Sequence, residues 1–346
     1  MSDGLRYLKE QLWPWLEGLA RFPLDPDQRL FWPYLVGAVV LALVVIARRP
    51  EANRRAGGRA WLATLFHPRV WWHPSARLDY QILLLNPLVV GLLGVTGLVS
   101  VTGLTIAISD WLDDWLGPAQ LQWPAWAVAA SFTLALFLAD DCSRYLLHRL
   151  LHRVPALWAL HKLHHSAQVL TPATVYRIHP LESALYALRM ALTQGLVVGV
   201  FFYGFGMRLG AWDIAGANLF TFLFNIAGSN LRHSHVRLSY GHWLERIFIS
   251  PAQHQVHHSN RPEHYDRNFG SFLAVWDWAS GTLVLAADAR RHGFGLGRGR
   301  SRETHGSLAQ AYLRPLSECL GCLGGHRLAG WCRRLSGPRA LPPTSS

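Results

Sequence analysis

The chain has 346 residues, of which 51% are hydrophobic and only 16% are charged, and its mean hydropathy is positive. This composition is too apolar for an ordinary soluble domain of this size and is typical of a membrane protein with several crossings. The formal net charge of +12 comes almost entirely from arginine. No basic helix or RNA-type aromatic motif accompanies these arginines, so we expect them to face a membrane surface and expect no nucleic-acid partner.

The N-terminal part of the chain, residues 1–79, is predicted to contain the first membrane crossing. Residues 1–29 carry mixed charges and lack the pattern of a cleaved signal peptide. The apolar run at 30–47 is just long enough to span a bilayer as a helix, and an arginine-rich stretch at 48–59 follows it. Because positive loops are generally cytoplasmic, this stretch is predicted to lie in the cytosol and the N-terminus outside.

Four further apolar runs are interpreted as membrane-crossing segments. The runs at 80–108 and 124–139 are each expected to cross once, with an acidic loop between them on the outside. The runs at 185–206 and 211–228 are expected to form a hairpin that enters and leaves the membrane. About five crossings follow, and both histidine-rich regions of the chain are then predicted to lie on the cytoplasmic face.

Histidines recur at helical spacing in these two regions. An H-x-x-x-H motif and an H-x-x-H-H motif come first, and on a helix the residues of each motif share one face. An N-x-x-H-x-H motif and a second H-x-x-H-H motif follow downstream. The motifs contain His148, His152, His161, His164, His165, His233, His235, His254, His257 and His258.

So many histidines at recurring spacings exceed what a single metal ion can bind. Imidazole nitrogen suits zinc, copper and iron, so the number of histidines predicts two adjacent metal ions. Histidines outside these motifs, with the exception of His179, are interpreted as ordinary surface or core residues. No H-E-x-x-H motif occurs, which argues against a zinc protease.

The motifs resemble those of the integral-membrane fatty acid hydroxylase and sterol desaturase superfamily over roughly residues 80 to 285. The closing stretch at 268–282 is also similar to that family. His179, in the sequence Arg-Ile-His-Pro-Leu-Glu seen in bacterial members, is a further candidate ligand. The resemblance implies an all-α fold: a polytopic membrane helical bundle with a cytosolic, histidine-rich helical cap.

The same resemblance implies a non-haem di-iron oxygenase that hydroxylates or desaturates a lipid C–H bond. Two iron ions, O2 as co-substrate and two electrons are then required, and a separate reductase or ferredoxin is expected to supply the electrons. A membrane lipid is the expected substrate, and a fatty acyl chain, a sterol or hopanoid, an ether lipid and an aminolipid all remain open. The expected location is a bacterial inner membrane.

A histidine-rich membrane protein that binds or transports metal without redox chemistry is the alternative. A transporter is expected to place ionisable ligands in the middle of its spans. The motif histidines lie almost entirely outside the apolar runs. Their position therefore favours the enzyme.

Carboxylates are expected to orient the imidazole rings. Asp141 is the first candidate because it lies two helical turns before His148 on nearly the same face. Glu182 and Asp277 are further candidates. Asp140 points about 100° away from Asp141 and is interpreted as a helix-end group at the water boundary.

Residues 80–285 are interpreted as a membrane-embedded fatty acid hydroxylase domain, and residues 286–346 as a flexible basic tail. A short helix is expected at 312–328. Cys319 and Cys322 form a C-x-x-C motif in this tail, which is compatible with a zinc site or a thiol pair. Because the cytosol is reducing, we expect no stable disulfide.

Overall fold

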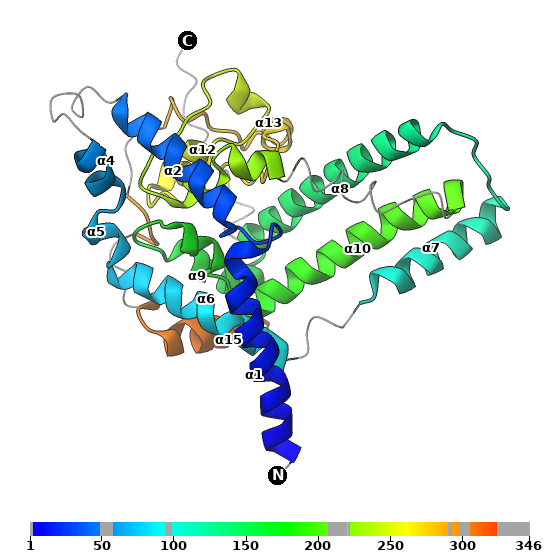
Figure 1. The fold of residues 1–346 in the computed structure, drawn as a ribbon, viewed down its shortest axis with the longest axis horizontal. Helices are drawn as coiled ribbons and strands as arrows, with labels where there is room; N and C mark the ends of the chain where they lie inside the picture. Colours follow the sequence, from blue (N-terminus) through cyan, green and yellow to red (C-terminus); the bar gives the residue numbers. More distant parts are fainter. Residues whose placement is uncertain are drawn as a thin grey trace.

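The computed structural model describes residues 3–48, 58–93, 99–206, 220, 222–289, 293–297 and 305–323. Within these residues the regular elements are helices, and extended pairing is limited to two isolated bridges. The all-α prediction is confirmed. The chain forms a head of mostly short helices, from which an arm of three long helices extends (Figure 1).

The arm consists of α7 (Val101–Leu116), α8 (Ala125–Arg153) and α10 (Pro180–Phe205). The head contains α2 (Trp32–Ala47), α4 (Gly58–Leu65), α5 (Pro68–Trp71), α6 (Pro74–Leu92), α9 (Pro155–His165), α12 (Pro251–His257), α13 (Val275–Ala279) and α15 (Leu308–Leu323). Single 3-10 turns connect these helices: η1 (Phe22–Leu24), η3 (Pro172–Tyr176), η5 (Ser229–His233), η6 (Leu244–Arg246) and η7 (Pro262–His264). Helix α1 (Asp3–Arg21) packs against α6.

Helices α8 and α10 are long and apolar enough to cross a membrane, with 29 and 26 residues. At about 1.5 Å per residue each is roughly 40 Å long, which exceeds the roughly 30 Å of a bilayer core. Helix α2 is apolar but shorter, with 16 residues. The apolar run at 124–139 continues without a break into the first histidine motif, so α8 carries that motif from the arm into the head.

Glycines allow α7 and α10 to pack closely in the arm. A Cβ atom at Gly195 would lie 2.6 Å from the Cβ of Leu104, and one at Gly199 would lie 2.9 Å from the Cβ of Ile108. Such distances are shorter than real carbon–carbon contacts, so a side chain at either position would push the helices apart. Small residues at close contacts are typical of helix pairs in membranes.

The apolar run at 80–108 is not one continuous helix. Helix α6 ends at Leu92 and α7 begins at Val101, so two helices divide this apolar run. The side chain of Ser100 caps α7 by accepting a hydrogen bond from the backbone N–H of Gly103 at 3.1 Å. Of the hairpin expected further along the chain, residues 211–219 lie outside the described residues.

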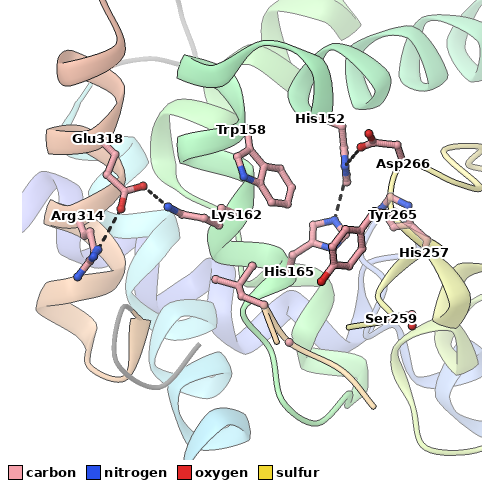
Figure 2. A pocket seen from close by; sticks show the side chains of 12 residues that line it. His152, Trp158, Lys162, His165, His257, Ser259, Tyr265, Asp266, Arg314 and Glu318 are labelled. Atoms are coloured by element: carbon pink, nitrogen blue, oxygen red, sulfur yellow. Dashed lines mark hydrogen bonds and ion pairs between the residues drawn. The ribbon is translucent and has the colours of Figure 1, made fainter. Parts of the chain in front are cut away.

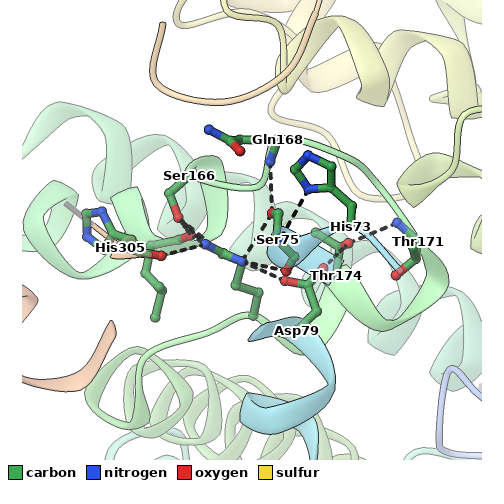
Figure 3. A network of polar contacts seen from close by, with 10 residues as sticks. His73, Ser75, Asp79, Ser166, Gln168, Thr171, Thr174 and His305 are labelled. Atoms are coloured by element: carbon green, nitrogen blue, oxygen red, sulfur yellow. Dashed lines mark hydrogen bonds and ion pairs between the residues drawn. The ribbon is translucent and has the colours of Figure 1, made fainter. Parts of the chain in front are cut away.

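A buried ion pair fastens α6 to the end of α9. Arg177 and Asp79 are 1% and 0% exposed, and their Nη1 and Oδ1 atoms are 2.8 Å apart. The same guanidinium donates to the carbonyl of Leu163 at 2.9 Å, to the hydroxyl of Ser166 at 2.7 Å and to the carbonyl of His305 at 3.3 Å (Figure 3). This network holds the last turn of α9 and the histidines on it.

Helix α15, within the predicted tail, packs against α9. Lys162 of α9 forms an ion pair with Glu318 of α15. The helix begins four residues before the expected start at 312. Cys319 and Cys322 lie in this helix as free thiols.

Candidate metal centre

A proline break between α8 and α9 brings the first two histidine motifs together. Helix α8 ends at Arg153 and α9 starts at Pro155, and Val154 between them is extended with φ −94° and ψ 121°. Proline has no backbone N–H and disfavours a helical conformation in the residue before it, so the first helix must end there. The rings of His148 and His161 consequently lie with their centroids 5.0 Å apart.

The second H-x-x-H-H motif lies on α12, whose N-terminus is fixed by a capping box. Ser250 accepts a hydrogen bond from the backbone N–H of Gln253 at 3.1 Å, and the Gln253 side chain accepts one from the backbone of Ser250 at 2.9 Å. Asn268, held at φ 55°, donates to the Gln253 carbonyl at 3.1 Å. His233 lies beside this helix at the end of η5.

Nine of the predicted histidines form two adjacent groups. Within each group the possible ligand atoms all lie within 4.8 Å of one another. The five-histidine group contains His148, His152, His161, His165 and His257. The four-histidine group contains His164, His233, His254 and His258.

Each H-x-x-H-H motif contributes to both groups. On α9, His161 and His165 belong to the five-histidine group and His164 belongs to the four-histidine group. On α12 the assignment is inverted, because the five-histidine group receives only His257. Helical positions i+3 and i+4 lie about 60° to one side and about 40° to the other side of position i, so one motif can serve two neighbouring sites.

The spacing of the nitrogens in the four-histidine group fits a shared metal ion. His233 Nε2 lies 3.1 Å from the Nε2 atoms of His254 and His258, and 3.3 Å from that of His164. Nitrogen ligands about 2.0–2.1 Å from one ion lie roughly 3.0–3.4 Å from each other in octahedral or tetrahedral geometry. The observed distances fall in this range.

The protonation of the imidazoles also fits metal binding. Burial lowers the pKa of His233 and of His257 to about 3, and holds the pKa of His164 and of His165 well below 6.5. The Nε2 atoms of His161 and His257 are buried without a hydrogen-bond partner. Neutral nitrogens with unused lone pairs are what a metal requires of histidine ligands, and an all-nitrogen set suits iron, zinc or copper.

Hydrogen bonds to the outward nitrogens orient three rings of the five-histidine group. His161 Nδ1 lies 2.7 Å from a carboxylate oxygen of Glu182, and both side chains are buried. His148 Nδ1 and His257 Nδ1 lie 2.8 and 2.7 Å from backbone carbonyls of the segment 267–269. In the four-histidine group, by contrast, the Nδ1 atoms of two rings are buried without a partner. The five-histidine group is therefore the more firmly oriented of the two.

The predicted hydrogen bond between Asp141 and a histidine is wrong. Asp141 is 0% exposed and accepts hydrogen bonds from the backbone N–H groups of Phe272 and Leu273 at 2.8 and 3.0 Å. It also accepts one from the indole of Trp276 at 2.8 Å. The side chain thus binds the loop after Phe269, and that loop in turn orients a histidine of α8.

Asp277 holds the same loop from its other end. It accepts hydrogen bonds from the backbone of Phe269 at 2.9 Å and of Gly270 at 2.7 Å, and from the Thr282 hydroxyl at 2.6 Å. A Cβ atom at Gly270 would lie 2.5 Å from the carbonyl oxygen of Leu273, so the loop is too tight for a side chain there. Burial raises the pKa of Asp277, whereas these hydrogen bonds act in the opposite direction.

The helix-end interpretation of Asp140 is also wrong. Helix α8 continues for more than three turns beyond this residue. Its carboxylate pairs with Arg144 at 2.7 Å and with Arg189 of α10 at 2.8 Å. Asp140 therefore joins two helices where the arm meets the head.

Two candidate ligands, His179 and His235, lie in neither histidine group. His179 is the N-cap of α10, where its Nδ1 accepts a hydrogen bond from the backbone of Leu181 and its Nε2 lies 3.1 Å from the carbonyl of Tyr312. His235 Nε2 lies 3.0 Å from the carbonyl of Thr64. Both rings therefore contact the backbone of neighbouring head segments.

A cavity of about 630 Å³ opens beside the five-histidine group (Figure 2). His152 and His165 line it, with their Nε2 atoms 3.1 Å apart, and the ring of Trp158 lies beside both. Lys162 and Glu318 form the opposite wall. The cavity thus gives a polar approach to one side of the histidine cluster.

A smaller cavity of about 370 Å³ touches histidines of both groups. Arg29, Arg144 and Arg232 line it together with apolar side chains. The histidine motifs give no indication of these arginines, because they are far apart in the chain and have no characteristic spacing. Only folding brings them to the site.

Residues 133–282 match the family model described as fatty acid hydroxylase. Alkylglycerol monooxygenase of Danio rerio is 28% identical over 53% of this chain and 37% of its own length. Ornithine lipid hydroxylase OlsE of Rhizobium tropici is 30% identical over 46% of this chain and 44% of its own. Delta(7)-sterol 5(6)-desaturase ERG3B of Gibberella zeae is 29% identical over 45% of this chain and 43% of its own length.

The matched region contains all nine clustered histidines. Residues 133–282 therefore form a domain of the fatty acid hydroxylase and sterol desaturase superfamily, and the predicted membership is confirmed. The matches cover less than half the length of these three relatives. No solved structure matches the chain.

Proposed function

We propose that this chain is a membrane-bound, non-haem di-iron oxygenase that hydroxylates or desaturates a C–H bond of a lipid. The observation that carries the proposal is the pair of adjacent histidine groups in the interior of the head. The names of the three relatives, a monooxygenase, a hydroxylase and a desaturase that each act on a lipid, support the same class of reaction.

We assign one metal ion to each histidine group, and iron as the metal in both. Bound iron supplies the reduction of O2 and the oxidation of an unactivated C–H bond, for which O2 and two electrons are consumed. The protein holds the imidazoles neutral by burial, so that their nitrogens remain available as ligands. Glu182 and the carbonyls of the 267–269 segment fix the directions of three rings.

The two cavities suggest separate approaches for electrons and lipid. Trp158 lies in the wall of the larger cavity. Its ring centroid is 5.0 Å from that of His152 and 5.5 Å from that of His165. This side suits a separate reductase or ferredoxin-type donor. The smaller cavity contacts both histidine groups and has apolar side chains in part of its wall, which suit a membrane lipid. We place the histidine cluster on the cytoplasmic side of a bacterial inner membrane.

Substitutions that each disrupt one of the two histidine groups test the proposal. The full chain, purified in detergent, is expected to contain two iron ions. His164→Ala and His257→Ala each alter a different group and are expected to remove about one ion each and to abolish lipid oxidation. Exposed His242, which lies in neither group, provides the matched control His242→Ala. Metal analysis and lipid profiling of cells with and without the chain measure both effects.

Full iron occupancy in both variants would contradict the ligand assignment. Iron bound to the wild type without any oxygenated or desaturated lipid, and without O2 consumption, would instead favour a protein that binds or carries metal. One added oxygen on a lipid would distinguish hydroxylation from desaturation.

A further inference from the structure

The smaller cavity is notable for its positive charge. Arg29 precedes α2, Arg144 lies on α8 and Arg232 lies in η5, and all three line the cavity. The cavity therefore concentrates three guanidinium groups next to the proposed reaction site.

Among the residues that the structure describes, one of the three arginines forms an ion pair with a carboxylate and the other two do not. Arg144 pairs with Asp140 at 2.7 Å. Arg29 donates only to neutral groups, the Asn225 amide oxygen and the Ser229 hydroxyl. Among the described residues, no carboxylate forms an ion pair with Arg29.

Arg232 likewise forms no ion pair with a carboxylate among the described residues, and it is more deeply buried. It is 6% exposed, donates to the carbonyls of Ile249 and Ser271, and its Nε is buried without a partner. An unpaired buried cation is costly, and an anion beside it would remove that cost.

The nearby carboxylates do not pair with these two arginines. Glu182 lines the same cavity; one of its oxygens binds His161 at 2.7 Å, and the other is buried without a hydrogen-bond partner. Both oxygens of Asp141 accept hydrogen bonds from the loop after Phe269. Among the described residues, neither Arg29 nor Arg232 therefore forms an ion pair with a carboxylate.

We propose that the smaller cavity binds the anionic group, carboxylate or phosphate, of a lipid substrate between Arg29 and Arg232. This proposal rests on the proposed function and specifies its substrate class. Guanidinium groups bind both anions through paired hydrogen bonds. Val175, Ile178 and Tyr186 form apolar wall beside the histidines, and this favours the headgroup of a lipid over a free anion.

Titration of the purified full-length chain in a non-ionic detergent tests the proposal. Dodecyl phosphate and dodecanoate are compared with dodecanol, which has the same chain and no charge. Isothermal titration calorimetry is expected to give binding about tenfold to hundredfold tighter for the two anions, as for a charge-assisted hydrogen bond. Added sodium chloride is expected to weaken the binding of the anions but not of dodecanol.

Substitution of the arginines tests which residues carry the preference. Arg29→Gln and Arg232→Gln are each expected to weaken anion binding about tenfold. Arg232→Lys is expected to weaken it less, because the charge remains although the paired hydrogen bonds are lost. Arg237, which donates to the carbonyl of Ala286 and does not line the cavity, provides the control Arg237→Gln, expected to bind as the wild type does. If Arg232→Gln fails to fold, the binding measured for Arg29→Gln and the salt dependence of the wild type still test the proposal.

Equal binding of dodecanol and dodecyl phosphate by the wild type would overturn the proposal, as would an anion preference that survives in both glutamine variants. Inorganic phosphate that binds as tightly as dodecyl phosphate would overturn the assignment to a lipid headgroup. Binding is measured without turnover, and the iron content of each sample is recorded. Failure here is therefore distinguishable from failure of the di-iron assignment.

Discussion

At the scale of single residues, the buried carboxylates of the head act at different distances from the imidazole rings. Glu182 contacts His161 directly, whereas Asp141 and Asp277 bind the loop that orients His148. Asp140 contacts neither the rings nor this loop and pairs with arginines instead. Substitutions at these positions should therefore differ in whether they affect metal affinity or stability.

We expect Glu182→Gln to lower iron affinity about 10- to 100-fold, since loss of a carboxylate behind a metal-bound histidine typically has this effect. Chelator competition on the purified protein measures it. Glu263, an exposed carboxylate of the head, supplies the control Glu263→Gln. Unchanged iron affinity in Glu182→Gln would show that its hydrogen bond to His161 does not matter for binding.

We expect Asp141→Asn to be the more damaging of the two adjacent aspartate substitutions. An amide places an N–H group against the loop donors and leaves buried groups unpaired, which costs about 1–3 kcal/mol of unfolding free energy. Asp140→Asn loses ion pairs at a partly exposed site and is expected to cost about 1 kcal/mol or less. Denaturant unfolding in detergent compares them, and a larger loss for Asp140→Asn would contradict the assigned roles.

At the scale of elements, the arm depends on the close approach of α7 and α10. Gly195 and Gly199 of α10 face Leu104 and Ile108 of α7 without room for a methyl group. Gly103 of α7 differs, because a Cβ atom there would meet only Ser100 at an ordinary 3.5 Å. We therefore expect substitution by alanine to have opposite effects on stability in α10 and at Gly103.

We expect Gly195→Ala to destabilise the protein by about 1–3 kcal/mol, because the added methyl group overpacks the helix contact. Gly103→Ala is expected to be neutral or to stabilise by up to about 1 kcal/mol, since alanine is the better helix former. Thermal unfolding of both variants in the same detergent provides the comparison. A stabilising effect of Gly195→Ala would mean that the two helices are further apart.

At the scale of the whole molecule, the long helix α8 couples the arm to the metal centre. Its first half is apolar enough for a membrane, and its last two turns carry His148 and His152. The head histidines therefore lie at one end of the spanning segment. The tip of the arm, where α7 ends and α8 begins, lies at the other end (Figure 1).

We expect cysteines introduced at Glu263 in the head and at Trp115 near the end of α7 to be labelled from opposite sides of the membrane. Both positions are exposed, and the four native cysteines would first be replaced. A membrane-impermeant maleimide added to intact cells should label position 115 and not position 263. Labelling of both from outside would contradict the cytoplasmic placement of the histidines.

The histidines themselves could be predicted from sequence because their chemistry depends on local helical geometry. Spacings of three and four residues place side chains on one face of any helix, whatever surrounds it. Eight of the nine residues that cluster in the structure belong to such motifs, and the ninth, His233, comes from the N-x-x-H-x-H motif. The apolar runs that became α8 and α10 are local in the same sense, since their length and composition alone qualify them to cross a membrane.

Only the tertiary structure decided how these motifs combine. The division of each H-x-x-H-H motif between two groups depends on how α9 and α12 face each other, and they are about 90 residues apart in the chain. The hydrogen-bond partners of Asp141 are equally non-local, since they lie more than 130 residues away in the chain. The same holds for Arg29 and Arg232, which line one cavity although they are distant in sequence. Contacts between distant segments leave no periodic pattern in a single sequence, because they are set by packing of whole elements and not by the repeat of one helix.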